Sequence, residues 1–437
     1  MCISQKVISD LCTCQQTGIN NSLIGLRRVI TNINRPYYYY LLFILILFIY
    51  KGVDEMKFTI NRHALTTQLA NVSRAIPSKA TIQILTGLKL SVNNEGITLI
   101  GSDSDISIES FLPIEDESLH LKIEETGHVV LPARLFNDIV KKLPLDDVTI
   151  DMNDNFTVTV TSGKATFNIV GIDGDSYPHL PEIEADKRII LPTASFKQMI
   201  NQTIFAASNQ ESRPVLTGIH LQATENHLTA IATDSHRLSK REIPVDISES
   251  QLNFDAITIP KKTMTELTRI VEDDQTLYMM VAQQQVIFEA EKLTIYSRLL
   301  EGNYPETSRL IPTTHQTEMV VNASEFHQAI DRAALMSHEG KNNVVQLSFE
   351  NSVVELSVSG NEVGHVAELI NTKDANGEDL RISFNPDYMK DALKSFGEID
   401  VKIEFQSAVR PLLISAETES EIPHNQLLQL LTPVRTH

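Results

Sequence analysis

The chain has 437 residues, of which 42% are hydrophobic and 21% are charged. A chain of this length predicts about three domains, because one domain usually has about 100 to 200 residues, and the composition excludes disordered, collagen-like and disulfide-scaffold proteins. The formal net charge of −19 argues against tight binding of nucleic acid by a broad basic surface, so a DNA-related function needs a locally basic face or a topological link.

Residues 1–55 differ in character from the rest of the chain. All three cysteines lie within the first 14 residues, so residues 56–437 have no thiol for a disulfide, a zinc site or a nucleophile. Residues 37–50 form the strongest apolar run, but they are fewer than the roughly 20 residues of a spanning helix, and no small-residue cleavage site follows. We interpret residues 1–55 as an N-terminal extension outside the fold; a membrane anchor or an interfacial segment is the alternative.

The rest of the sequence contains three copies of one unit. Ile84–Leu90 (ILTGLKL) recurs as Val215–Leu221 (VLTGIHL) about 130 residues later, and the same offset relates Ser102–Ser104 to Thr233–Ser235. A weaker third copy lies in residues 344–360. Such an internal repeat predicts tandem domains of one kind.

Each copy is expected to contain two helices and antiparallel strands. The first helix of each copy has apolar residues spaced by three and four; these residues are Leu65, Leu69, Val72 and Ile76, then Phe196, Ile200 and Ile204, then Phe326, Ile330 and Ala333. The second helices are predicted at residues 132–143, 260–271 and 385–396. Alternation at residues 156–160 and 354–358 predicts half-buried strands.

We therefore predict an α+β fold of three tandem domains, each with two helices packed on antiparallel sheets. The similar connectors Tyr177–Pro181 and Tyr304-Pro305 place the domain boundaries. The predicted domains are residues 56–182, 183–312 and 313–437.

The sequence predicts no catalytic or metal site and no cofactor. Residues 233–237 contain Asp, Ser and His, but the members of a catalytic triad converge from separate elements, whereas neighbours point apart. A polar turn and a binding site remain the two interpretations of this segment. The His338-Glu339 pair lacks the second histidine of a zinc-protease helix, and the acidic stretches 115–117 and 272–274 are typical of solvated loops. A nuclease or nucleotidyl transferase would need a carboxylate metal site.

Three strings carry a resemblance to a known family: Arg213–Gly218 (RPVLTG), Ala232–Leu238 (ATDSHRL) and Thr432–Arg435 (TPVR). Together with the three tandem units, they make residues 56–437 resemble the bacterial β sliding clamp, the DNA polymerase III β subunit. Gln83 and Leu135 depart from common residues of that family, which leaves local contacts open.

The resemblance implies a non-enzymatic processivity factor for DNA replication, cytoplasmic and associated with the nucleoid. It implies a head-to-tail homodimeric ring that encircles duplex DNA without regard to sequence, with helices around the hole. The implied partners are the replicative polymerase, the clamp loader, mismatch-repair and other proteins with a clamp-binding motif, and there is no small-molecule substrate. Since a ring holds DNA by topology, the acidic total is no contradiction.

Candidate site residues follow from the resemblance by position. The dimer interface is expected to use Phe167 and Ile169 against Leu335 and Met336. The DNA-facing candidates are Lys79, Arg134, Lys141, Lys142, Arg213, Lys261 and Lys262. The candidates for a pocket that binds partner peptides are Leu216, Thr233, Ser235, His236, Arg237, Leu238, Pro305, Arg309, Leu310, Leu430, Thr432 and Val434, with Tyr388 as a gate. Core packing and solvated surface charge are the alternatives for these residues. The alternative function is a protein-binding multidomain scaffold, associated with the membrane through residues 37–50.

Overall fold

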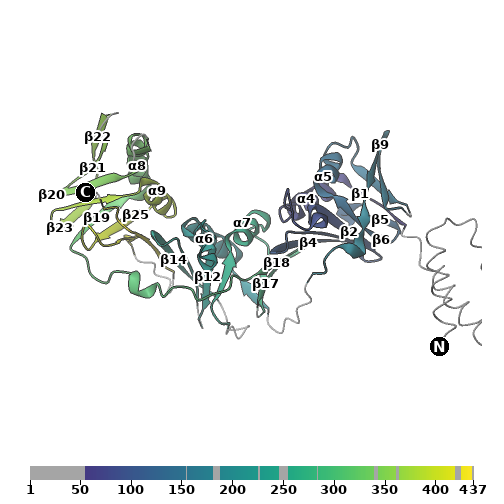
Figure 1. Ribbon diagram of the computed structural model, residues 1–437, viewed down its shortest axis with the longest axis horizontal. Helices are drawn as coiled ribbons and strands as arrows, with labels where there is room; N and C mark the ends of the chain where they lie inside the picture. Colours follow the sequence, from purple (N-terminus) through teal and green to yellow (C-terminus); the bar gives the residue numbers. More distant parts are fainter. Residues whose placement is uncertain are drawn as a thin grey trace, which may run out of the picture.

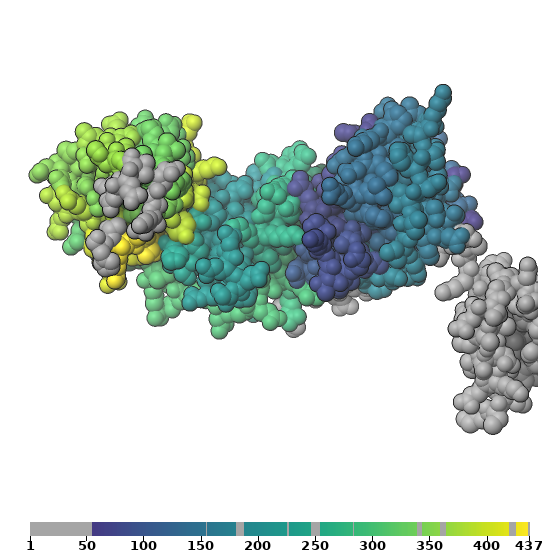
Figure 2. All heavy atoms as spheres, turned by 45° about the horizontal axis from the view of Figure 1, so that its top comes forward, coloured from purple at the N-terminus to yellow at the C-terminus, as the bar shows by residue number. Residues whose placement is uncertain are grey.

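The structure is a computed structural model that describes residues 55–153, 155–180, 188–224, 227–245, 254–282, 284–338, 343–360, 364–418 and 425–435. These residues form three domains in a bent row, and the helices lie on the concave side of the row (Figure 1). Figure 2 shows the three domains as successive lobes along the chain. Residues 1–54 and the connector at residues 181–187 lie outside the described part, so the boundary after residue 182 stays a prediction, as does that after residue 312.

Domain 1 begins at a strand whose alternate residues Met56, Phe58 and Ile60 are buried. The side chain of Asn61 then accepts hydrogen bonds from the backbone N–H groups of His63 and Ala64, which starts the first helix. The elements of this domain are β1 (Met56–Asn61), α4 (Arg62–Val72), β2 (Gly87–Asn93), β3 (Gly96–Ser102), β4 (Ile106–Pro113), β5 (Lys122–Glu125), β6 (Gly127–Pro132), α5 (Ala133–Lys141), β7 (Asp147–Met152), β8 (Thr157–Ser162), β9 (Ala165–Val170) and β10 (Ile172–Asp173).

Domains 2 and 3 repeat this order of elements, except that the described residues contain no counterpart of β5 in domain 2 and no counterpart of β10 in either domain. Domain 2 contains β11 (Ile189–Leu191), α6 (Thr193–Thr203), β12 (Gly218–Ala223), β13 (His227–Thr233), β14 (Arg237–Pro244), β15 (Ile257–Pro260), α7 (Lys261–Ile270), β16 (Leu277–Val281), β17 (Gln285–Ala290) and β18 (Leu293–Arg298). Domain 3 contains β19 (Thr317–Asn322), α8 (Ala323–His338), β20 (Val345–Glu350), β21 (Val353–Gly360), β22 (Gly364–Leu369), β23 (Asp374–Gly377), β24 (Leu380–Phe384), α9 (Pro386–Lys394), β25 (Asp400–Phe405), β26 (Leu412–Ala416) and β27 (Leu427–Leu431).

The predicted α+β fold of three tandem clamp domains is confirmed, with two longer helices in each domain. The helix α4 ends at Val72, so Ile76 lies in the turn that follows. The described residues contain no helix long and apolar enough to span a membrane; the apolar run 37–50 lies outside them.

Two of the four sheets run across domain borders. A nine-stranded sheet joins domains 1 and 2 by pairing β4 with β18, and a second nine-stranded sheet joins domains 2 and 3 by pairing β14 with β27. The remaining sheets have five strands, ending at β9, and four strands, ending at β22. These two edge strands lie at opposite ends of the row (Figure 1). Each end of the row of domains therefore has an edge strand that pairs with no further strand among the described residues.

Candidate functional site

The candidate peptide site lies where domain 2 meets domain 3. Strand β14 pairs with β27, which sets Leu238 opposite Leu430. The backbone N–H of Thr432 donates to the carbonyl of His236 (2.8 Å), and that of Val434 donates to the carbonyl of Ser383 (2.7 Å). The end of the chain thus lies across both domains and brings these predicted residues together.

Several of the apolar residues predicted for this site are buried inside the protein. The side chains of Leu216, Leu238 and Leu430 are buried, and the latter two pack with Ile231 under the ring of Tyr304. Leu310 and Val434 keep 49% and 37% of their surface exposed. Of the predicted apolar residues, these two and Pro305 offer surface to a partner, while the buried leucines support the floor.

The turn at residues 233–237 is a repeated structural feature. Asp234 accepts hydrogen bonds from the N–H groups of His236 and Arg237 (2.9 and 3.0 Å), and Asp103 does the same one domain earlier. The residues that follow these aspartates, Ser235 and Ser104, both adopt a left-handed backbone with φ of 77° and 84°. The segment is therefore a polar turn whose Ser, His and Asp side chains do not form a triad, and the binding-site interpretation stays a prediction.

Arg237 joins the two domains instead of lying open to a ligand. Its guanidinium is within hydrogen-bonding distance of Asp234 (3.0 Å) and Asp391 (2.6 Å) and donates to the carbonyl of Phe205 (2.6 Å). The Arg237 side chain is 12% exposed. Its charge lies 4.4 Å from the centroid of the Tyr388 ring, a cation–π contact that fixes this predicted gate residue.

The remaining predicted pocket residues lie at the rim. His236 is exposed, and its ring stacks at 6.4 Å on that of Tyr388. Pro305 and Arg309 are exposed on the loop between domains 2 and 3, and Arg309 forms an ion pair with Glu306 (3.1 Å). The Thr233 hydroxyl donates to the carbonyl of Arg237 (2.6 Å), a contact within the turn.

The predicted DNA-facing residues lie on helices or on loops beside them. Arg134, Lys141 and Lys142 are exposed on or at the end of α5, and Lys79 and Arg213 are exposed on the loops that follow α4 and α6. Within the described part of the chain, none of these five forms an ion pair.

The two lysines at the start of α7 are less available. Lys262 forms an ion pair with Asp103, across the border between domains 1 and 2. Lys261 contacts Asn209 (3.3 Å), and its pKa is lowered by burial and by the charge of Arg237. Both lysines therefore make contacts within the protein that would compete with binding of a DNA phosphate.

The predicted interface residues lie at the two ends of the row. Phe167 is on the edge strand β9 and is partly exposed, and Leu335 on α8 is 70% exposed. Met336 is partly buried against the core of domain 3. The side chain of Ile169, on the same edge strand, is 2% exposed and packs in the core of domain 1, so its role in the interface stays a prediction.

Two groups of histidine and carboxylate side chains come together among the described residues. In the first, His128 Nε2 lies 3.1 Å from Asp175 and 3.8 Å from Asp173, all at the surface. In the second, Lys402 contacts Glu318 (2.8 Å) beside His315 and Glu404, so the lysine already supplies the positive charge. Neither group is assigned to a metal here.

Comparisons with known proteins decide the family. The models of the N-terminal, central and C-terminal domains of the DNA polymerase III beta subunit match residues 56–181, 190–306 and 308–429. The chain belongs to the DNA polymerase III beta subunit family.

Relatives within this family match over their whole length. The beta sliding clamp of Bacillus subtilis is 44% identical over 385 residues, which are 87% of this chain and 100% of that protein. The crystal structure of the DNA polymerase sliding clamp from the same organism matches with a TM-score of 0.83 at 43% identity, covering 88% of this chain and 100% of that one. A DNA polymerase III beta chain from Streptococcus pneumoniae matches with a TM-score of 0.82 at 40% identity, covering 87% and 100%. A membrane-associated scaffold is therefore not favoured for this family member.

Three exposed side chains on the second helices were not among the site residues predicted from the sequence. Arg269 and Lys394 occupy the last turns of α7 and α9, where α5 has Lys141. Leu135 on α5 is 51% exposed, although it lies in an otherwise amphipathic helix. Aligning the second helices of the three repeats would have revealed this basic position, because each of these helices has Lys or Arg in its last turn.

Proposed function

We propose that two copies of this chain form a head-to-tail ring that encircles duplex DNA and tethers a DNA polymerase to it, without a catalytic site of its own. The proposal rests on a junction between domains that occurs twice within the chain. The strands that would form a third such junction lie at the two ends of the row, without a partner among the described residues. In the ring, two chains supply six domains of one kind, and closure removes the free edges.

The two internal junctions have the same geometry. At the first junction, the N–H of Phe111, just before the end of β4, donates to the carbonyl of Lys292 (2.9 Å), which precedes β18. At the second junction, the N–H of Glu242 in β14 donates to the carbonyl of Gln426 (2.8 Å), which precedes β27. Strand pairing thus follows one pattern. The strand that corresponds to β4 in one domain (the β4-type strand) pairs with the strand that corresponds to β9 in the next domain (the β9-type strand).

Two strands that this pattern would pair, β22 and β9, have no such partner among the described residues. Strand β22 is the β4-type strand of domain 3, and β9 is the strand of domain 1 that corresponds to β18 and β27. Joined between two copies, their sheets of four and five strands make nine, the size of both internal junction sheets. The internal register sets Ile108 opposite Ile295. By the same register, Val366 of one copy lies opposite Phe167 of the other.

The helices next to these strands support the same closure. At the second internal junction, Phe205 in the turn after α6 and Tyr388 of α9 lie on the guanidinium of Arg237 (5.4 and 4.4 Å). The corresponding positions in the open junction are Leu335 and Leu135. These exposed leucines are proposed to pack on each other between the two copies, which accounts for apolar side chains at both ends of the row.

The concave face is the proposed DNA surface. Lys141, Arg269 and Lys394 lie at the same place on the second helix of each domain. In a two-copy ring, this basic position recurs in every domain around the hole. Weak phosphate contacts of this kind are independent of sequence and allow sliding, while closure of the ring prevents loss of the DNA.

The junction of domains 2 and 3 is the proposed docking site for partner peptides. Leu310 and Val434 supply exposed apolar surface beside the polar rim of His236 and Arg309. Such a surface suits an extended peptide with a few apolar anchors, carried by the replicative polymerase, the clamp loader or a repair protein. These partners act at the nucleoid, where we place this chain.

A disulfide between two copies tests the proposed ring. Residues 56–437 contain no cysteine, so Phe167→Cys with Val366→Cys, in a chain with Cys2, Cys12 and Cys14 changed to Ser, introduces a single pair. Opposed residues of an antiparallel pair have Cα atoms about 4.5 to 5.5 Å apart, which is within disulfide range. We expect oxidation to give a covalent dimer on non-reducing gels. The pair Phe167→Cys with Val353→Cys is the control, and equal cross-linking of both pairs would refute the register.

A further inference from the structure

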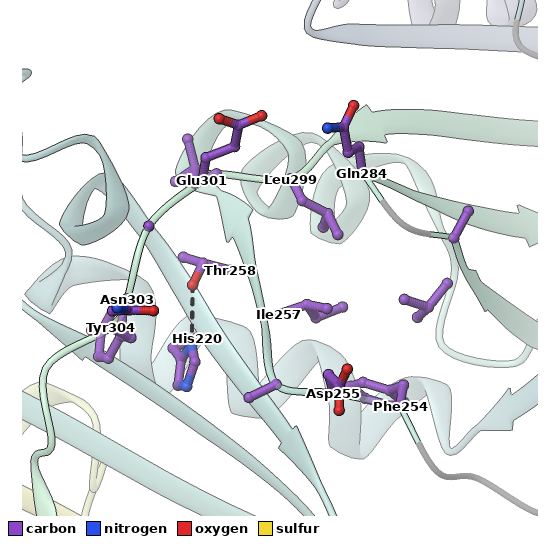
Figure 3. Close-up of a pocket in the computed structure, with 15 residues that line it drawn as sticks. His220, Phe254, Asp255, Ile257, Thr258, Gln284, Leu299, Glu301, Asn303 and Tyr304 are labelled. Carbon is purple, nitrogen blue, oxygen red and sulfur yellow. Dashed lines mark hydrogen bonds between the residues drawn. The ribbon is translucent and has the colours of Figure 1, made fainter.

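A second cavity lies beside the proposed peptide site, on the same face of the sheet. Its volume is about 1170 Å³, and strands β12 and β15, the end of β16 and the segment that follows β18 line it. Figure 3 shows its wall, with Tyr304 and His220 at one side and Phe254 and Asp255 at another.

Tyr304 lies between the cavity and the peptide site and contacts both. One side of its ring stacks on His220, with 4.3 Å between ring centroids and 5° between planes. The same residue packs against Ile231, Leu238 and Leu430 of the peptide site. A chain lying over Leu238 therefore reaches the cavity by crossing Tyr304.

The described lining of the cavity carries negative charge. Asp255 and Glu301 are exposed carboxylates at its rim, and among the described residues that line it none is Lys or Arg. His220 is neutral at pH 7, because burial lowers its pKa to about 4, and its Nδ1 contacts the Thr258 hydroxyl (3.0 Å). This charge disfavours phosphates and acidic ligands and favours a cation.

The rest of the lining suits the alkyl part of a long basic side chain. Ile257 and Leu299 provide apolar surface between the two carboxylates, and Phe254 lies beside Asp255 (Figure 3). Lysine and arginine bury their methylene groups on such surface while their charged ends stay near water and carboxylates.

We propose that this cavity binds a lysine or arginine that flanks the apolar anchors of a partner peptide. The proposal rests on the peptide site described above and adds the chemistry of the flanking residue. Three strand spacings separate β14, which carries Leu238, from β15, which carries Thr258. At about 4.8 Å per spacing and about 3.3 Å per residue, an extended peptide spans this distance with about four residues.

The test uses fluorescence anisotropy with synthetic peptides that carry one glutamine and leucine anchors. Each peptide has Lys, Gln or Glu four residues from the anchors, in separate versions for the N-terminal and C-terminal flanks. For one flank, we expect the Lys version to bind the full-length chain about two- to fivefold more tightly than the Gln version, and the Glu version more weakly, as for solvent-accessible ion pairs.

Variants assign this preference to the cavity. We expect Asp255→Asn with Glu301→Gln to abolish the preference for Lys and to leave binding of the Gln version unchanged, while Asp255→Asn with Glu301→Lys, which makes the rim positive, reverses the preference towards Glu. Glu117→Gln with Glu272→Gln removes the same charge from exposed sites elsewhere, and we expect it to keep the preference.

The outcomes separate this inference from the peptide site itself. If the Gln version binds but the Lys version gains nothing, the cavity proposal is wrong and the peptide site stands. Equal loss in both charge variants would mean long-range attraction to an acidic protein and would also refute the cavity. If no version binds, the peptide site fails and the cavity proposal fails with it.

Discussion

The guanidinium of Arg237 in domain 2 lies 2.6 Å from the carboxylate of Asp391 in domain 3. The same guanidinium also contacts Asp234 and the Phe205 carbonyl, so one mostly buried cation holds α9 against domain 2. This contact fixes the position of Tyr388 beside the peptide site and helps to set the angle between the domains, on which the curvature of the row depends.

Loss of Arg237 is expected to loosen this junction. Removing one partner of a buried ion pair costs about 3 to 5 kcal/mol, and because Asp391 is partly exposed, we expect Arg237→Ala to lower the free energy of unfolding by about 2 to 3 kcal/mol. Chemical denaturation measures this loss. The control Arg309→Ala removes an exposed arginine and should change stability by less than about 0.5 kcal/mol. Equal effects of the two variants would contradict the role of Arg237.

The exposed leucines at the ends of the row are expected to control dimer formation. Leu335→Asp places a charge in the proposed apolar contact, and we expect the dimer dissociation constant to rise by more than about tenfold. Leu135→Asp should act equally from the other side, whereas Val409→Asp, on an exposed turn of domain 3, should leave the dimer intact. Sedimentation velocity measures the dissociation. The double variant Leu335→Ala and Met336→Ala should also dissociate, but Met336 contributes to the core as well. A stable dimer of Leu335→Asp would refute the interface.

The repeated basic position is expected to contact DNA phosphates. Replacing Lys141, Arg269 and Lys394 by Glu should weaken binding of short linear duplex and reduce the salt dependence by about 0.9 for each lost contact. Anisotropy titrations over a range of salt concentrations measure this slope. The control replaces Lys122, Arg298 and Arg381, which are exposed on strands, by Glu. If both triple variants lose binding equally, net charge and not the concave face governs the interaction.

The peptide site is expected to depend on its exposed apolar residues. Leu310→Asp, or deletion of Thr432–His437, should weaken binding of polymerase and clamp-loader peptides by about 2 kcal/mol or more, which is about 30-fold. Val409→Asp serves again as the control for an apolar surface position. Unchanged peptide affinity of the Leu310 variant in a folded dimer would remove the site from this account.

His220 is expected to make domain 2 sensitive to acid. Burial lowers its pKa to about 4, below the value of about 6.5 in an unfolded chain, so the unfolded state binds the proton first. Its contribution is therefore complete above about pH 6.5 and is lost as the pH falls towards 4. We expect stability to fall between pH 7.5 and 5 by on the order of 1 to 2 kcal/mol more in the native chain than in His220→Gln. Parallel denaturation curves for the two proteins would contradict this.

The sequence predicts what is local and repeated. Apolar spacing predicted the helices, and the repeat predicted three domains of one kind. The resemblance named Phe167 and Ile169 together, but no local pattern shows that the domain core covers Ile169 and leaves Phe167 partly exposed. The contact between Arg237 and Asp391 joins residues from separate domains, and no local pattern carries that information. The open junction became visible once the strand pairs of the two closed junctions were known.

Retention on DNA tests the central claim most directly. The Phe167→Cys, Val366→Cys ring is closed by oxidation around nicked circular DNA, and the amount of protein that stays with the DNA in high salt is measured before and after the circle is cut. A topological link predicts that the closed ring stays on the circle in high salt, where phosphate contacts are screened, and is released on linearisation. Loss from the intact circle, or equal retention on linear DNA, would contradict a ring that encircles the duplex.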